Sequence, residues 1–200
     1  MNNSDIKNRA KAAMANNWGT AILVFIVYGL INSALSATGI GAFAAGLLNV
    51  GLSAFFLTII REQKAGFENF FNGITEFIGT KFVSMLLVQL YTMLWSLLFY
   101  IPGIVKSYSY AMTPYILLDK PELSATEAIT ESRNMMNGHK MELFLLDLSF
   151  IGWILLSILT CGLLLFYVVP YMQAARAEFY RTLKGDDEKK AEEPFIEIPH

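Results

Sequence analysis

Long uncharged runs dominate the pattern of polar and apolar positions. Asp, Glu, Lys and Arg are absent from residues 12–60, 82–105, 107–118 and 148–175. A helix that crosses about 30 Å of hydrocarbon needs about 20 apolar residues, so the first run of 49 residues is long enough for two crossings. Soluble folds rarely contain such runs. The pattern therefore predicts an all-α, polytopic integral membrane protein.

Charges and glycines divide these runs into six predicted membrane-spanning helices. Their ranges are 18–37, 40–60, 82–101, 104–118, 141–160 and 163–175. The fourth and sixth are short and reach only about 20 Å. They must extend into flanking residues, thin the bilayer or be re-entrant. A bundle of four spans is the alternative.

The distribution of basic residues favours six spans, because Lys and Arg in short loops stay in the cytoplasm. With a cytoplasmic N-terminus and six crossings, every Lys and Arg except Lys106 lies inside. If 104–118 failed to cross, Lys120, Arg133 and Lys140 would lie outside. We therefore expect three helical hairpins with both termini cytoplasmic. Their outer turns are predicted at Gly39 and Gly41, at Pro102-Gly103 and at Cys161-Gly162.

The cytoplasmic connections carry helical patterns of their own. One apolar stripe predicts an amphipathic helix along the membrane surface; it is formed by Phe67, Phe70, Phe71, Ile74, Phe77 and Ile78. Ser124 and Glu127 have the spacing of a capping box, which predicts a helix that ends before Asn137-Gly138. The N-terminal residues Ile6 to Met14 form a weaker third pattern.

An internal threefold repeat is indicated by this order of interfacial helix, span, glycine turn and span. Pro114-Tyr115 and Pro170-Tyr171 each precede a basic residue, Lys120 and Arg176, at the same spacing, although the first unit lacks the motif. We expect one transmembrane domain over residues 1–184. The tail 185–200, rich in acidic residues and Lys, is expected to be disordered in the cytoplasm.

Composition narrows the chemistry. A net charge of −2 argues against nucleic acid as a partner. Cys161 is the only cysteine, and His139 and His200 are the only histidines, so no disulfide and no zinc site is expected. Residues 39–44 fit a dinucleotide-binding pattern but lack its strand and acidic residue, which favours helix packing by small residues. Without a catalytic motif, we expect a non-enzymatic protein with no metal and no cofactor.

Apart from Glu142 at the start of the fifth predicted span, Asp147 is the single acidic residue inside a predicted span, which makes it a candidate functional group. It lies about as far before the turn at Cys161-Gly162 as Arg176 lies after it. The two side chains are therefore predicted to form an ion pair near the cytoplasmic boundary. A structural ion pair that locks the last hairpin is the favoured interpretation, and a proton or ion relay is the alternative.

Other polar residues inside the spans have two interpretations each. Lys106 is expected to extend its amine to the outer headgroups. Four amides could line a pore or hydrogen-bond to neighbouring helices: Asn32, Asn49, Gln89 and Gln173. The prolines and glycines in the fourth and sixth spans could make discontinuous helices of the kind that form transporter sites, or simple kinks.

The second half of the chain carries motifs that resemble a known family. They are Pro102-Gly103-Ile104, Tyr110-Ala-Met-Thr-Pro114-Tyr115, Asp119-Lys-Pro121, Ser132-Arg-Asn-Met135-Met136-Asn-Gly138-His-Lys140 and Leu148-Ser149-Phe150-Ile151-Gly152-Trp153. Together they resemble domain-of-unknown-function family 975, uncharacterised integral membrane proteins of bacteria. The resemblance implies a multi-pass protein of the bacterial cytoplasmic membrane and brings no activity.

Three functions remain open. The leading hypothesis is an accessory, scaffold or membrane-organising protein whose partners are the lipid bilayer and an unidentified membrane or cytoplasmic protein. The second is a small-molecule or ion transporter, which a homo-oligomer would suit. The third, a lipid-modifying enzyme, needs polar side chains that meet at headgroup depth. A polar cavity inside the bundle would favour transport over a scaffold.

Overall fold

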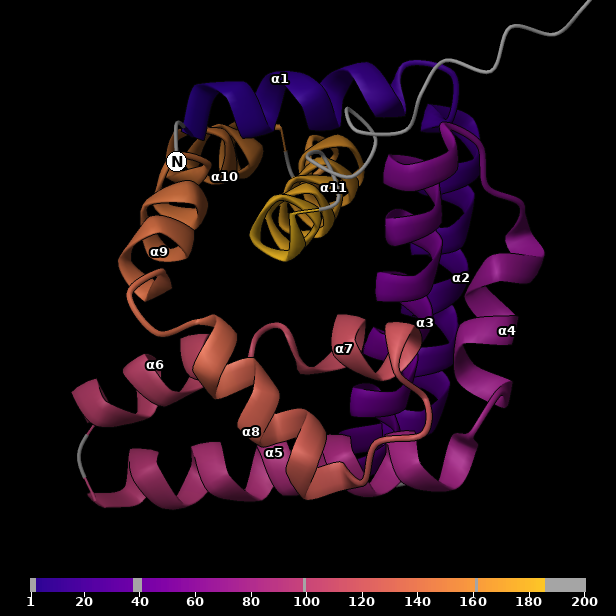
Figure 1. Cartoon of the computed structure of the whole chain (residues 1–200). Helices are drawn as coiled ribbons and strands as arrows, with labels where there is room; N and C mark the ends of the chain where they lie inside the picture. Colours follow the sequence, from indigo (N-terminus) through magenta and orange to yellow (C-terminus); the bar gives the residue numbers. More distant parts are fainter. Residues whose placement is uncertain (1–2, 38–40, 99, 161, 186–200) are drawn as a thin grey trace, which may run out of the picture.

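The structure is a computed structural model that describes residues 3–37, 41–98, 100–160 and 162–185, and within these ranges it is built from helices without strands (Figure 1). The helices are α1 (Asn3–Met14), α2 (Trp18–Ala37), α3 (Gly41–Glu62), α4 (Phe67–Thr75), α5 (Ile78–Leu98), α6 (Tyr100–Ser109), α7 (Thr113–Asp119), α8 (Ala125–Met135), α9 (Lys140–Leu148), α10 (Ile151–Leu159) and α11 (Leu165–Lys184). The predicted all-α class is confirmed.

These helices form three consecutive units that close into a ring. Each unit has a connecting helix, an outer helix and a return helix. In the first unit these are α1, α2 and α3, and in the second they are α4, α5 and the broken pair α6–α7. In the third they are α8, the broken pair α9–α10 and α11. The connecting helices α4 and α8 pack on the return helices of the units before them, α3 and α7. The first helix, α1, packs in the same way on the last, α11, so the first and last described helices close the ring (Figure 1). Alongside, α2 runs next to α3 and α5 runs crosswise to both (Figure 1).

The return helix α3 lies at the centre of the buried core. Phe55, Phe56 and Ile59 on this helix are fully buried. Small residues allow its neighbours to approach closely, since a Cβ at Gly46 would lie 2.6 Å from Cβ of Met85 on α5. Close packing through small residues was the interpretation that the sequence favoured for this region.

Four helical stretches are long and apolar enough to cross a membrane. They are Trp18–Ser36, Ala45–Glu62, Ile78–Trp95 and Lys140–Leu159. They fall within or overlap four of the six predicted spans. The predicted span 104–118 is not one helix, because a turn at residues 110–112 separates α6 from α7.

The outer turns differ in part from the prediction. Pro102 and Gly103 lie inside the first turn of α6, so a turn at this dipeptide is wrong. Proline is tolerated there because the first turn of a helix has no carbonyl for its missing N–H to meet. Gly162 has a φ of 84°, a left-handed conformation that suits a turn. Residues 38–40 and Cys161 lie outside the described residues.

The connecting helices carry the predicted local signals. The Ser124 hydroxyl accepts a hydrogen bond from the Glu127 amide, and the Glu127 carboxylate accepts one from the Ser124 amide, so the capping box is confirmed. Gly138 ends the following turn with a φ of 85°. On α4, Phe70 is buried against the protein while Phe67 and Phe71 face outward. The predicted tail lies outside the described residues from 186 onward.

Candidate functional site

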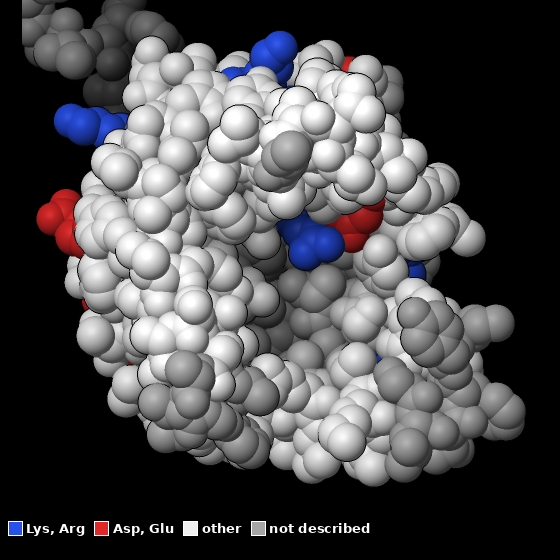
Figure 2. Space-filling model, turned by 180° about the vertical axis from the view of Figure 1, so that it is seen from behind, with Lys and Arg blue, Asp and Glu red and all other residues white. Residues whose placement is uncertain are grey.

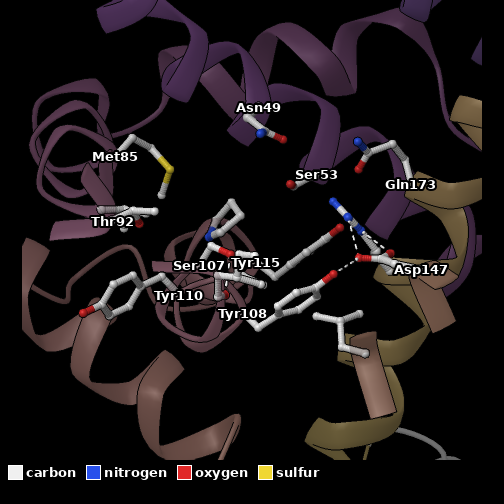
Figure 3. A pocket seen from close by; sticks show the side chains of 16 residues that line it. Asn49, Ser53, Met85, Thr92, Ser107, Tyr108, Tyr110, Tyr115, Asp147 and Gln173 are labelled. Carbon is white, nitrogen blue, oxygen red and sulfur yellow. Dashed lines mark hydrogen bonds and ion pairs between the residues drawn. The ribbon is translucent and has the colours of Figure 1, made fainter. Parts of the chain in front are cut away.

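Asp147 and Arg176 lie together in the structure. Arg176 donates from Nη2 to Asp147 Oδ2 over 2.7 Å and from Nε to Oδ1 over 3.0 Å. The Tyr108 hydroxyl donates to the same carboxylate over 3.2 Å. Three helices contribute to the group, since Tyr108 lies on α6, Asp147 on α9 and Arg176 on α11 (Figure 3). Two parallel N–H···O bonds fix the orientation of both side chains.

This ion pair forms part of the wall of a cavity of about 410 Å³. The cavity lies among α3, α5, α6, α7, α9 and α11, and polar side chains surround much of it (Figure 3). Besides the ion pair, these are Asn49, Ser53, Thr92, Ser107, Tyr108, Tyr110, Tyr115 and Gln173. From behind, the surface of the molecule is hollowed, with basic and acidic side chains at the edge of the hollow (Figure 2). Its volume suits a small molecule.

One break in the helices borders the cavity, and a second comes just after the cavity residue Asp147. The first is the turn between α6 and α7, where Tyr110 and Ala111 line the cavity. Its cause is Pro114 in the first turn of α7, which lacks an N–H and cannot continue the α6 hydrogen-bond ladder. The second lies at Ser149-Phe150, between α9 and α10 and just after Asp147. Broken helices beside a polar cavity are typical of transporter sites.

Two of the four amide side chains that could line a pore lie at the cavity, and two do not. Asn49 and Gln173 line the cavity, and they lie on α3 and α11 (Figure 3). Asn32 and Gln89 are not among its lining residues. The sequence alone could not separate these pairs, because each amide sits in an apolar helix and only the packing of the helices decides which one faces inward.

Asp119 forms a second charged centre, which the sequence pattern did not single out. Arg61, at the end of α3, donates from Nη1 to Oδ1 over 2.6 Å and from Nη2 to Oδ2 over 2.8 Å. Tyr180 and Lys184 on α11 donate to Oδ2 over 2.8 and 2.6 Å. The only signal in the sequence was the place of Asp119 in the motif Asp119-Lys-Pro121. The carboxylate therefore joins the ends of the three return helices.

The electrostatics of Asp119 follow from these donors. Burial alone would raise the pKa of its carboxyl, because it disfavours the charged form. Hydrogen bonds from Arg61, Lys184 and Tyr180 stabilise the anion more strongly and lower the pKa from 3.8 to about 2. Asp119 is therefore a permanent anion at neutral pH.

A third ionic group holds the first helix on the last. Glu178 on α11 is fully buried, and its Oε1 lies 3.0 Å from Nε of Arg9 on α1 and 2.9 Å from Nη2 of Arg181. Arg9 also donates to the Thr182 hydroxyl over 3.1 Å. These contacts give the closure of the ring a specific register.

Lys106 does not lie where the sequence placed it. Its amine sits 4.7 Å above the ring of Trp95, and it lines a second pocket together with Arg133 of α8. The sequence put these two cations on opposite membrane faces, and that assignment is wrong because α8 packs along α5 and α7 instead of lying apart on the surface. The Ser132 hydroxyl on α8 donates to the Ser109 carbonyl over 3.0 Å, which shows how deeply α8 is inserted.

Side chains of the types that bind metals are dispersed in the described part of the chain. No group of three or more His, Cys, Asp and Glu side chains gathers there in a way that could hold a metal ion. The acidic residues of the described site are instead held by basic partners.

The fold and the site together define a helical protein with four helices suited to a membrane and a polar cavity between its return helices. Residues 99–187 match the model of DUF975, described as a protein of unknown function, which confirms the resemblance seen in the sequence motifs. No curated protein and no solved structure matches the chain.

Proposed function

We propose that the protein is a permease-like membrane protein that admits a small polar solute to the cavity beside Asp147 and Arg176. The observation that carries this proposal is the polar lining of that cavity between helices that are otherwise apolar. Polar side chains inside a membrane domain are unfavourable unless they meet water, one another or a ligand. A protein that only organised the membrane would be stable with a filled, apolar interior.

The two helix breaks support the same function. The turn at residues 110–112 leaves backbone outside regular helix at the cavity wall, and the break at residues 149–150 comes just after Asp147, which lines the cavity. Irregular backbone at membrane depth is tolerated where it lines a water-filled space. The ion pair of Asp147 and Arg176 then holds α9 and α11 in register at the cavity wall, whereas a proton relay would require Asp147 to exchange its partner.

The topology that goes with this function has six crossings of a bacterial cytoplasmic membrane and cytoplasmic termini. In it, α6 and α7 form one broken crossing, α8 is inserted beside this crossing so that Arg133 reaches the depth of Lys106, and α11 begins the last crossing. The four long apolar helices support four of these crossings. Association of several copies would give such a small protein a larger membrane footprint.

Accessibility of the cavity to water provides the test. The neighbouring residues Thr92 and Met93 on α5 are a matched pair, because Thr92 lines the cavity while Met93 is 69% exposed on the outside. Each is replaced by Cys in a Cys161→Ser background and treated with a charged, membrane-impermeant methanethiosulfonate. The cysteine thiolate attacks this reagent, forming a mixed disulfide and releasing methanesulfinate, and the thiolate forms only in contact with water.

We expect Thr92→Cys to react at least about tenfold faster than Met93→Cys, since one pKa unit of the thiol corresponds to a factor of ten. A permease exposes its cavity to each side in turn, so the reaction should occur both in intact cells and in inverted vesicles. Reaction of neither residue would contradict the proposal. Reaction from one side alone would make the cavity a closed-ended vestibule and would also contradict transport.

A scaffold function keeps one specific observation in its favour. Phe67 and Phe71 on α4 are 36% and 41% exposed, and Phe77 in the following turn is 58% exposed. These rings could bind the lipid surface or a protein partner. Replacing Phe67 and Phe71 by Ser would remove that contact without touching the cavity, so loss of a copurifying partner in this variant would favour the scaffold.

A further inference from the structure

A second pocket, formed by α5, α6 and α8, has a lining of the opposite character to the ion-paired cavity. Its volume is about 300 Å³, and it contains the cations Lys106 and Arg133 without any acidic residue. Lys140 adds to the positive electrostatic potential at Lys106. Two like charges in one pocket repel each other, and bringing them together requires an anion or ready access to water.

The ionic partners of the other described arginines make this pocket unusual. Arg9, Arg61, Arg176 and Arg181 each lie against a carboxylate in the structure. Within the described residues, Arg133 has no such partner, and the Lys106 amine lies over the face of the Trp95 ring, 4.7 Å away.

The carboxylates on α8 do not supply the missing charge. Glu131 is bound to Lys120, and Glu127 is bound to Ser124 in the capping box. Both are therefore engaged elsewhere and are absent from the pocket lining. The positive charge of Lys106 and Arg133 is left for a ligand.

The remaining lining suits a phosphate group. Tyr91 and Tyr110 are phenols with ring centres 6.3 Å apart at the pocket, and hydroxyls donate well to phosphate oxygens. Arg133 can bind two phosphate oxygens at once, while Lys106 supplies a point charge. Nothing in the lining would repel an anion.

The surroundings of the pocket identify the source of the phosphate. Apolar side chains on α5 and α6 are exposed beside the pocket and could contact acyl chains. They are Met93 and Leu94 on α5, 69% and 48% exposed, and Val105 on α6, 46% exposed. Trp95 is 40% exposed at the pocket, and Trp and Tyr are enriched where a protein meets lipid headgroups. Basic pockets between helices beside an apolar surface are suited to anionic phospholipids.

We propose that the α5–α6–α8 pocket binds the phosphate group of an anionic phospholipid through Lys106 and Arg133, with the acyl chains along the exposed faces of α5 and α6. The site is separate from the solute cavity, so it stands whether or not the protein is a permease.

Native mass spectrometry of the full-length protein in detergent tests the proposal. Phosphatidylglycerol is compared with phosphatidylcholine of the same acyl chains, and inorganic phosphate is used as a competitor. A cation at a membrane surface contributes about 1 kcal/mol to binding of an anionic lipid, so Arg133→Gln or Lys106→Gln should weaken phosphatidylglycerol binding by about fivefold and the double variant by about 25-fold. Arg133→Lys should retain part of the binding.

Lys64→Gln is the matched control, because it removes the same charge from an exposed position outside the pocket, and we expect it to bind like the wild type. The wild-type preference for phosphatidylglycerol needs no variant, so it remains informative if a substitution disturbs folding. Equal binding of the two lipids would overturn the proposal, as would unchanged binding in the double variant. Displacement of the lipid by millimolar inorganic phosphate would assign the pocket to free phosphate and overturn the lipid.

Discussion

Arg61 and Asp119 are 58 positions apart in the chain, yet their side chains form a two-pronged ion pair at 2.6 and 2.8 Å. Arg61 lies in the last turn of α3 and Asp119 ends α7, so the pair ties the first unit of the ring to the second. Tyr180 and Lys184 extend the tie to the third unit through the same carboxylate. One acidic side chain thus joins all three units.

Asp119→Asn should destabilise the protein by about 3 kcal/mol, because it removes the charge of a largely buried ion pair while keeping the shape of the side chain. The measurement is thermal or denaturant unfolding of the purified protein in detergent. The control is Glu131→Gln, whose partner Lys120 is 47% exposed and whose loss should cost less than about 1 kcal/mol. Equal effects of the two substitutions would contradict a central role for Asp119.

The stability should also depend on pH through Asp119. Its pKa in the folded protein, about 2, lies below its ordinary value of 3.8, so the folded state favours the ionised form. The stabilisation is complete above the unfolded pKa and is lost as the pH falls through the folded pKa. The difference in stability between wild type and Asp119→Asn should therefore shrink between about pH 4 and pH 2. A constant difference across this window would show that Asp119 acts without its charge.

Much of the helical content could be predicted from the sequence, because uncharged runs report burial in lipid or core regardless of the tertiary fold. Asp147 and Arg176 could be expected to meet because a hairpin fixes the relative depth of residues at equal distances from its turn. Arg61 and Asp119 belong to different units, and their contact depends on how the units pack. No local spacing encodes that packing.

The breaks beside the cavity show a second limit. Pro114 predicts the turn before α7. In contrast, no residue in the apolar segment around Ser149-Phe150 predicts the break between α9 and α10. The absence of a local signal for packing also explains why the position of Lys106 was not predicted. Its neighbour Arg133 comes from α8, which was expected among the cytoplasmic connections. Tertiary packing carried α8 against α5, and charge patterns alone cannot report that.

Asp147 and Arg176 should behave as a structural pair. We expect Asp147→Asn to destabilise the protein by about 2 kcal/mol, because the Arg176 guanidinium keeps its charge beside the cavity. Arg176→Gln added to Asp147→Asn should cost less than the sum of the two single effects, with a coupling of about 1–3 kcal/mol. Unfolding in detergent measures all four members of the cycle. Full stability of Asp147→Asn together with loss of solute uptake would instead assign Asp147 to a relay.

The packing of α4 against α3 can be tested by making the same substitution at two glycines. A Cβ at Gly73 would overlap Cβ of Ala54 on α3, and the adjoining Gly51 leaves equally little room beside Ile74. Gly73→Ala should therefore force α4 away from α3 and destabilise the protein by about 1–3 kcal/mol.

A Cβ at Gly29, on α2, would meet nothing within 4 Å. Gly29→Ala should stabilise the protein by up to about 1 kcal/mol, because alanine favours the helix and reduces the freedom of the unfolded chain. Opposite signs for the same chemical change, measured by unfolding in detergent, would attribute the difference to the α3–α4 contact. If both variants were stabilised, α4 would have to sit farther from α3 than the structure places it.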